Sequence, residues 1–350
     1  MIAGTVTVRA PRRALLRLGG MAVRVDLRVL AGLAAALLGL VLLACWAMTL
    51  GNFPIAAHEV VATLFGQGTA RQDFIVWTLR LPRVLAAAGA GALLAMSGAV
   101  FQGLFRNPLV SPDVIGINAG ASLAAVFWIV TQRAAGLLPL SAFVGAVAAA
   151  ALVYALAWRR GIAGTRAILV GIGVNAAFAA ATTVLLVRFP LESVAGAVLW
   201  TTGSVYASAM SEVAFLFAGL AVLLPVGAVL MWSLRVLQLG DLAARSLGQR
   251  VEAVRLGLIL VGCAAAAMAI SIAGPIGFVA FMIPHLARML AGPMSGGVFV
   301  FTATLGALYL VAADMVGQHA FGVALPVGVV TSALGAPYFL YLLWRGHARL

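Results

Sequence analysis

Long apolar stretches without a charged side chain recur along the whole chain, separated by short polar segments rich in arginine, proline and glycine. The hydrocarbon core of a bilayer is about 30 Å thick, so a helix of about 20 apolar residues crosses it. The run that begins at 256 is too long for one crossing, and Gly274-Pro275 divides it. The pattern predicts ten membrane-spanning helices, at about 28–50, 82–105, 114–132, 137–158, 167–187, 213–234, 254–273, 275–291, 298–315 and 326–344.

Two segments differ from these full crossings. The stretch 193–211 carries several Gly, Ser and Thr residues, which predicts a short helix or a re-entrant piece beside a cavity. The segment 1–26 is an Arg-rich cytoplasmic arm, and 27–350 form a single transmembrane domain. Arg12-Arg13 ahead of an apolar run also resembles a twin-arginine or lipoprotein signal. Because that run is longer than a signal sequence needs and nine further spans follow, the pattern favours a first transmembrane helix.

Composition supports this fold class, an all-α polytopic membrane protein, and excludes one kind of enzyme. The 350 residues are 64% hydrophobic and 9% charged, whereas a soluble domain is about half apolar and a quarter charged. All 22 basic residues are arginine, so the chain lacks the lysine of a Walker-type ATP site. The arginines lie between apolar runs and not in one patch, so no nucleic-acid partner is indicated.

The arginines also predict orientation. With the N-terminus inside, 17 arginines fall on the cytoplasmic side and five on the outer side. This excess follows the positive-inside rule, so both termini are expected in the cytoplasm. The outer five are Arg71, Arg80, Arg83, Arg133 and Arg188, and the inner set is Arg9, Arg12, Arg13, Arg17, Arg24, Arg28, Arg106, Arg159, Arg160, Arg166, Arg235, Arg245, Arg250, Arg255, Arg288, Arg345 and Arg349.

Side chains suited to catalysis or metal binding are scattered. The two cysteines and four histidines stand in separate segments, so we expect no catalytic residue, no metal site and no enzyme. Ion-coupled carriers place carboxylates near the middle of their spans, and these spans hold almost none. A passage lined by neutral polar groups fits better, and the candidates in the fifth span are Asn175, Thr182 and Thr183.

The cytoplasmic turn 106–113 is a candidate gate. Its two prolines and its asparagine stiffen the connection between two spans. A stiff turn favours a constriction at the inner end of a passage, although a plain interhelical turn is the alternative. The candidate gate residues are Asn107, Pro108 and Leu109.

The longest cytoplasmic connection, about 235–255, is expected to hold a short helix. Asp241 can cap its N-terminus, and Gly248 suits its C-terminal end. A soluble partner could receive this helix in a groove, or the helix could lie at the membrane surface without a partner. The residues alone do not separate these two interpretations. The candidate contact residues are Gly240, Asp241, Ala243, Ala244, Leu247 and Gly248.

On the outer side, Arg80 and Arg83 run against the general inside bias of the arginines. Their guanidinium groups could pair with carboxylates of a docking protein. Anchoring at the lipid headgroups is the alternative, and it is favoured from the residues alone.

Motifs spread in order over about 73–344 resemble the permease subunits of type II ABC importers, the FecCD family for ferric siderophores, haem and vitamin B12. A finer likeness, to ferric-enterobactin permease subunits of the G type, rests on 157–162 and 171–175. The family motifs are Arg80-Leu81-Pro82-Arg83, Ser97 to Gln102, Arg106-Asn107-Pro108-Leu109, Pro112 to Gly116, the Leu239–Gly248 loop, Ala273 to Phe278, Pro284 to Arg288, Ala313-Asp314, Leu325 to Thr331 and Leu334 to Pro337.

This resemblance implies an assembly in a bacterial cytoplasmic (inner) membrane. Its other members would be a second permease subunit, two ATP-binding subunits that hold ATP and Mg, and a substrate-binding protein. A heterodimer of permeases is favoured over a homodimer. This chain would bind no cofactor itself, and its cargo would be a ferric siderophore, with catecholates first and haem or vitamin B12 as the alternative.

The resemblance also implies roles for individual residues. The helix at 240–248 would be the coupling element on the ATPase, and Arg80 and Arg83 would dock the binding protein. Asn107 and Leu109 would lie at the cytoplasmic gate. Some family members place a further docking arginine where this chain has Gln318, so a salt bridge from that position is not expected here.

Overall fold

The computed structural model describes residues 13–18, 21–51, 53–158 and 164–347. Within these residues each of the ten expected spans coincides with one α-helix, and seven of the long helices are apolar enough to cross a membrane. The ten helices are α1 (Leu27–Thr49), α4 (Leu81–Leu104), α5 (Ile117–Val130), α6 (Leu138–Ala157), α7 (Gly164–Arg188), α9 (Met210–Leu237), α11 (Val251–Ala273), α12 (Val279–Ala291), α13 (Gly296–His319) and α14 (Val327–His347).

Shorter elements complete the chain. The stretch expected as a short helix or re-entrant piece contains one, α8 (Leu191–Thr201), and the loop helix expected near 240–248 is α10 (Asp241–Ser246). The sequence did not predict a hairpin of β1 (Arg13–Leu18) and β2 (Met21–Asp26), so the all-α expectation holds for the membrane domain and not for this arm. The remaining elements are α2 (Ala57–Leu64), α3 (Ala70–Asp73), a π-helical turn at Phe74–Arg80 and a 3-10 turn at Ala135–Leu137.

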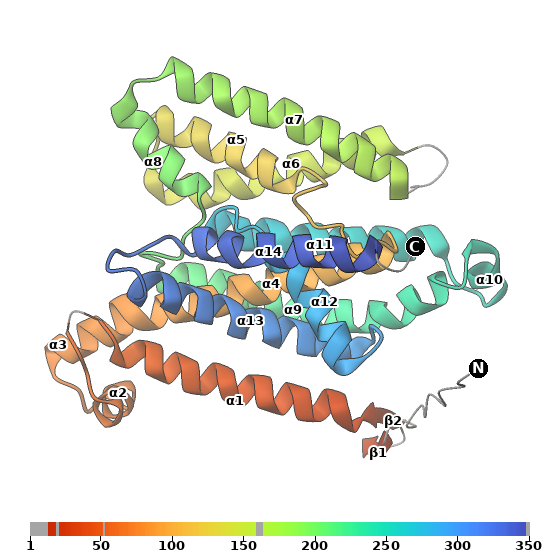
Figure 1. Ribbon diagram of the computed structural model, residues 1–350, viewed down its shortest axis with the longest axis horizontal. Coiled ribbons are helices and arrows are strands. Elements are labelled where there is room, and N and C mark those ends of the chain that lie inside the picture. Colours follow the sequence, from red (N-terminus) through yellow and green to blue (C-terminus); the bar gives the residue numbers. More distant parts are fainter. Residues whose placement is uncertain (1–12, 19–20, 52, 159–163, 348–350) are drawn as a thin grey trace.

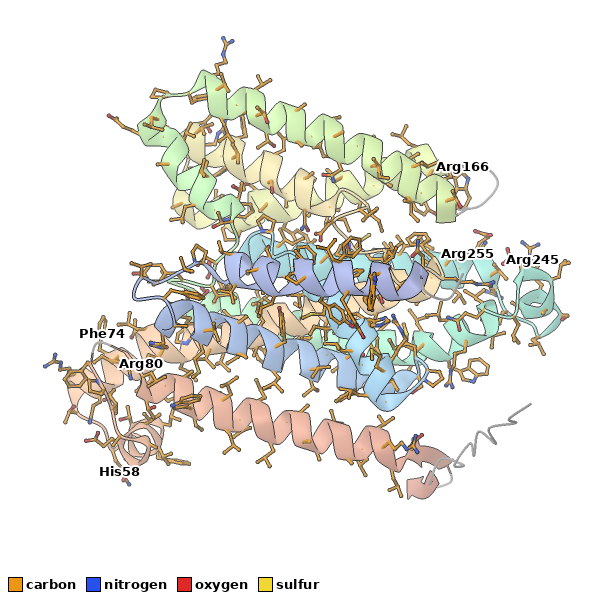
Figure 2. All side chains as sticks on the ribbon, viewed as in Figure 1. His58, Phe74, Arg80, Arg166, Arg245 and Arg255 are labelled. Atoms are coloured by element: carbon orange, nitrogen blue, oxygen red, sulfur yellow. The ribbon has the colours of Figure 1, made fainter. Side chains whose placement is uncertain are left out.

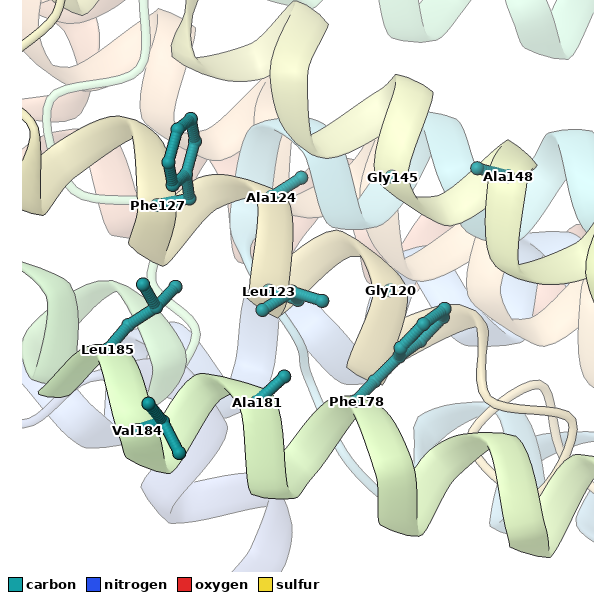
Figure 3. Close-up of a pocket in the computed structure, with 10 residues that line it drawn as sticks. All are labelled: Gly120, Leu123, Ala124, Phe127, Gly145, Ala148, Phe178, Ala181, Val184 and Leu185. Atoms are coloured by element: carbon teal, nitrogen blue, oxygen red, sulfur yellow. The ribbon is translucent and has the colours of Figure 1, made fainter.

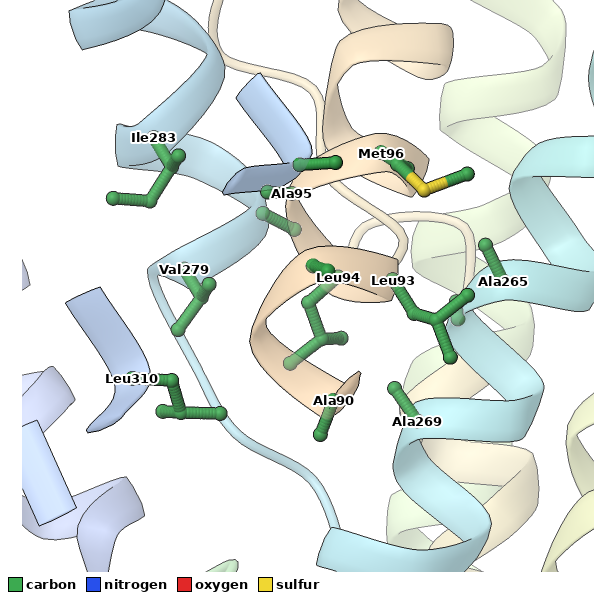
Figure 4. Packing of buried hydrophobic residues seen from close by; sticks show 14 of the residues in the cluster. Ala90, Leu93, Leu94, Ala95, Met96, Ala265, Ala269, Val279, Ile283 and Leu310 are labelled. Atoms are coloured by element: carbon green, nitrogen blue, oxygen red, sulfur yellow. The ribbon is translucent and has the colours of Figure 1, made fainter. Parts of the chain in front are cut away.

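Helix α4 runs through the middle of the molecule. Figure 1 shows α5 to α8 on one side of it and α1 on the other, with α9, α11, α12, α13 and α14 around it. Almost every residue of α4 from Val84 to Gln102 is buried. Its Leu93, Leu94 and Met96 pack with side chains of α11, α12 and α13, as Figure 4 shows.

Small residues allow the helices around α4 to approach its backbone. A methyl group added at Gly98 would lie 1.7 Å from the carbonyl oxygen of Ala280 in α12, and one at Gly91 would lie 2.3 Å from that of Gly306 in α13. No larger side chain fits at either crossing. The glycine-rich composition therefore reflects close helix packing at these points.

The break expected at Gly274-Pro275 is confirmed, but the next helix begins later than expected. Helix α11 ends at Ala273 and α12 begins at Val279, so the segment between them is not helical. Gly274 adopts φ +68, and an added methyl group there would meet Trp200 O at 2.6 Å. Phe278 also has a positive φ of 65.

Functional segments gather at the two ends of the bundle. The hairpin β1–β2, α10 and the last turn of α14 lie at one end, and α2, α3 and α8 lie at the other (Figure 1). The even number of crossings predicted from the sequence would place both chain ends on the same side. We call the end with α10 the inner end and the opposite one the outer end, following the prediction from the arginines.

Candidate functional site

The loop between α4 and α5 forms a fixed turn at the inner end. Asn107 accepts a hydrogen bond from the backbone N–H of Leu109 at 2.9 Å through its Oδ1. The N–H of Asn107 donates to Gln102 O at 3.2 Å. Pro108 and Leu109 are exposed. The three candidate gate residues therefore lie together on one turn whose tip is open to its surroundings.

Two arginines tie this turn to neighbouring helices. Arg106, with a φ of 51, donates from Nη2 to Leu237 O of α9 at 2.5 Å. Buried Gln102 donates to Phe281 O of α12 at 2.9 Å and accepts from Nη2 of Arg288 at 2.7 Å. The end of α4 is thus bonded to both α9 and α12. These bonds give a structural reason for the motifs that contain Gln102 and Arg288.

Asp113 is a half-buried acidic group of the same loop. Its carboxylate accepts hydrogen bonds from the hydroxyl of Ser111 at 3.5 Å and from the side-chain amide of Asn118. Burial raises the pKa of Asp113 to about 6, although both hydrogen bonds act to lower it. Sequence reasoning placed Asp113 only within a motif and did not single it out, because burial of a loop carboxylate has no signature in the local pattern.

Helix α10 stands outside the bundle with a leucine face exposed. Leu242 is 87% exposed and Leu247 is 64% exposed, and Leu239 just before the helix is 67% exposed. Ala244 is buried on the opposite side. Gly248 ends the helix with φ +81, as predicted. The exposed leucines form an apolar surface, which we call the α10 face, at the inner end.

The prediction that Asp241 caps α10 is wrong. Gly240 occupies the cap position and no side chain bonds the first turn. Asp241 is the first helical residue, and both of its carboxylate oxygens accept from Nη2 of Arg255 in α11, at 2.8 and 3.0 Å. Arg255 lies 14 residues further along the chain, and a charge-assisted pair with a partner on another helix outweighs a local cap.

The two outer arginines already have partners within the chain. Arg80, labelled in Figure 2 at the outer end, donates to the backbone oxygens of Met48 and Phe53, each at 2.5 Å. Arg83 makes a two-bond pair with Asp314 of α13, at 2.9 and 2.8 Å. The sequence had identified both arginines but neither set of partners. A docking carboxylate would therefore have to compete with these internal bonds.

Gln318 belongs to the same outer cluster. Its Nε2 donates to Oδ2 of Asp314 at 2.7 Å, so Gln318 supports the partner of Arg83. Asp314 is 4% exposed. The result is a compact polar group, Arg83–Asp314–Gln318, between α4 and α13.

A cavity of about 630 Å³ lies beside this cluster at the outer end. Arg83 is one of its lining residues, with Trp200, Tyr206 and Glu212. A backbone bond joins two other lining residues, since Ser204 N donates to Ala273 O at 2.8 Å. Charged, aromatic and hydroxyl groups are therefore combined in a hollow formed by the ends of several helices.

The expected pathway residues of α7 are bonded to their own helix. Thr182 donates to Phe178 O at 2.9 Å and Thr183 to Ala179 O at 3.0 Å. Asn175 is half-buried on the same helix. Between α5, α6 and α7 lies an apolar cavity of about 720 Å³ (Figure 3), with Phe127, Phe178 and Leu185 among its lining residues. Neither the three expected pathway residues nor the residues that line this cavity are titratable, so they form no proton relay.

In the part of the chain that the structure describes, no group of three or more His, Cys, Asp or Glu side chains is placed to hold a metal ion. The arginines at 159 and 160, which also carry part of the finer likeness, lie outside the described residues.

Comparison with known proteins identifies the family. A model of the FecCD transport family matches residues 39–345. The achromobactin transport system permease protein CbrC of Dickeya dadantii (strain 3937) is 39% identical over 331 residues, which cover 93% of this chain and 95% of that protein. The ferric enterobactin transport system permease protein FepG of Escherichia coli (strain K12) is 40% identical over 300 residues, which cover 85% of this chain and 91% of that protein.

The fold agrees with this result. A solved metal-chelate type ABC transporter in an inward-facing conformation superimposes with a TM-score of 0.80 at 28% sequence identity, over 90% of this chain and 99% of that one. The family model spans most of the chain and includes every motif that suggested the resemblance. The chain therefore belongs to the FecCD transport family.

Proposed function

We propose that this chain is the permease subunit of an ABC importer that brings a ferric siderophore from a binding protein into the cell, across a bacterial inner membrane. The α10 face is the observation that carries this proposal. Because the chain has no lysine, it lacks a Walker-type ATP site and needs an ATPase partner. The exposed leucines at the inner end offer that partner a contact surface. Apolar side chains presented by a short helix are a common form of groove recognition. ATP and Mg would be bound by the partner, and no cofactor by this chain.

The remaining partners follow from the same proposal. Two ATP-binding subunits would seat the α10 elements of two paired permeases, and a binding protein would deliver cargo at the outer end. We propose a second permease of different sequence as the pairing partner, and co-purification of two differently tagged copies of this chain would instead indicate a homodimer. Asn107, Pro108 and Leu109 would close the passage from the inside.

A catecholate such as ferric enterobactin is the cargo that we propose first. FepG supports it, yet CbrC, whose name gives achromobactin, has nearly the same identity. Similarity alone therefore does not choose among siderophores. Haem and vitamin B12 are the alternative cargo classes within the family. An ion-coupled carrier is not supported, because the buried carboxylate Asp314 is paired with Arg83.

Uptake in cells tests this function. ATP-dependent entry of labelled ferric enterobactin is measured with and without this chain, with excess haem and vitamin B12 as competitors. Loss of uptake on deletion, without competition, is expected. Unchanged iron uptake with lost haem or vitamin B12 entry would replace the cargo, and unchanged entry of all three would contradict the proposed cargo class.

The docking of the binding protein needs a separate test. Arg80→Glu and Arg83→Glu should weaken its binding to the complex and leave ATPase association intact. Because Arg83→Glu also breaks the pair with Asp314, Asp314→Asn serves as the control for loss of that pair. Equal weakening by Asp314→Asn would assign the effect to the outer structure and not to direct docking.

A further inference from the structure

Two glycines with positive φ angles bound helix α10. Gly240 has φ +104 and Gly248 has φ +81, values that disfavour other residues. A methyl group added at either position would meet nothing within 4 Å. The space around them is open, so glycine is required there for conformation and not for packing. The six-residue helix is thus a short rigid piece between two permissive joints.

The buried side chain of Ala244 and one polar side-chain link hold this piece against the bundle. In the described part of the chain, the polar link between α10 and α11 consists of the two bonds of Asp241 with Arg255, at 2.8 and 3.0 Å. Both oxygens of the carboxylate bond one nitrogen of the guanidinium, while Nη1 of Arg255 bonds Glu252 at 3.2 Å. Asp241 and Glu252 therefore bond different nitrogens of the Arg255 guanidinium.

Helix α11 extends from this link to the outer cavity. Near its middle, Gly262 O accepts from the hydroxyl of Ser97 in the central helix α4 at 2.7 Å. At its outer end, Ala273 O accepts from the N–H of Ser204, and Ser271 to Ala273 line the outer cavity. One continuous helix thus contacts α10, the centre of the bundle and the wall of the outer cavity.

We propose that the Asp241–Arg255 pair is the connection through which a displacement of α10 is passed to α11, and so toward the outer cavity. The proposal rests on the proposed function, since it assumes that an ATPase moves α10. Arg255 and Asp241 act as positioning residues that touch neither cargo nor nucleotide. Without their pair, only the apolar contact of Ala244 and the backbone connections would link α10 to its neighbours, so a displacement of α10 should reach α11 less completely.

The pair is partly accessible, with side-chain exposures of 22% for Arg255 and 44% for Asp241. Its loss should therefore change coupling more than folding, because ion pairs of this kind contribute little to stability. The effect should appear where the two ends of the complex must communicate. Stimulation of ATP hydrolysis by the binding protein is such a measurement, and it does not require the cargo to cross.

The test uses the full complex in proteoliposomes, with the ATPase and the binding protein present. Asp241→Asn and Arg255→Gln should each leave ATPase association intact and lower the stimulation by the binding protein roughly two- to fivefold, the range expected for a partly exposed pair. Exchange of the two charges, Asp241→Arg with Arg255→Asp, should restore stimulation. Glu252→Gln is the matched control, because it removes only the bond within α11, and should change little.

Each outcome has a distinct meaning. Wild-type stimulation in both single variants, or no restoration by the charge exchange, would overturn the linkage while leaving the importer assignment in place. A wild-type chain that does not co-purify with an ATPase would overturn the proposed function, and the linkage with it.

Discussion

Arg83 and Asp314 stand 231 positions apart in the sequence and form the best-defined ion pair of the outer end. The residues alone favoured anchoring of Arg83 at the lipid headgroups over docking of a partner protein, and Asp314 entered as part of a motif. The structure combines them, because an isolated charge among apolar helices is costly and a paired one is less so. A local pattern cannot reveal such pairing, since it depends on how α4 and α13 cross.

Removal of the acidic partner should destabilise the chain. Asp314→Asn leaves the Arg83 guanidinium without its counter-charge in a site where Asp314 is 4% exposed. Breaking a buried pair from one side costs about 3 kcal/mol or more. The midpoint of thermal unfolding in detergent should fall clearly below that of wild type. Glu192→Gln, at an exposed acid of α8, is the control, and an equal shift in both variants would contradict the role of the pair.

Asp113 should make stability depend on pH. Its pKa in the folded chain is raised from the ordinary 3.8 to about 6, so between these values the folded chain keeps a proton that the unfolded chain releases. Stability should therefore fall as pH rises from 3.8 toward 6 and change little above that. The loss is at most about 3 kcal/mol, at about 1.4 kcal/mol per pKa unit. Unfolding midpoints of wild type and Asp113→Asn across this range test it, and the same slope in both would refute the assignment.

At the scale of elements, the apolar pattern was sufficient to locate the helices and insufficient to define their ends. Each of the ten expected spans coincides with an α-helix in the described residues, and seven of these helices are long and apolar enough to cross a bilayer. Helix α12 starts late where Gly274 and Phe278 both have a positive φ, and the backbone at Gly274 lies close to Trp200 of α8 and Gly203 of the following loop. Helix α2 was missed because eight residues outside the spans leave too short a pattern.

The crossing of α4 with α12 allows a direct test of element packing. Gly98→Ala would place a methyl group 1.7 Å from Ala280 O, so α12 must move away. We expect a loss of more than about 3 kcal/mol, above the usual cost of overpacking because the neighbour is backbone. Gly173→Ala in α7, where an added methyl group meets nothing within 4 Å, should be neutral or slightly stabilising. Unfolding midpoints that fall equally in both would show that this crossing is not tight.

For the whole molecule, every proposed role depends on which end of the helix bundle faces the cytoplasm. The α10 face can meet an ATPase only if its end of the bundle is cytoplasmic, and the outer cavity can meet a binding protein only if α2, α3 and α8 lie outside. The 17-to-five division of arginines predicts this arrangement. The structure adds that β1–β2, α10 and the end of α14 share one end (Figure 1). The sidedness of the bundle can be measured directly.

Single cysteines at the two ends would determine it. In a chain with Cys45→Ser and Cys263→Ala, Phe65→Cys places a thiol where the native side chain is 80% exposed after α2, and Ser246→Cys places one on α10. A maleimide that does not cross membranes should label Phe65→Cys in intact spheroplasts, and Ser246→Cys only after permeabilisation. The cysteine-free chain controls for background. The opposite labelling would place α10 outside the cell, where no ATPase could reach it, and would remove the basis of both the importer proposal and the linkage through α11.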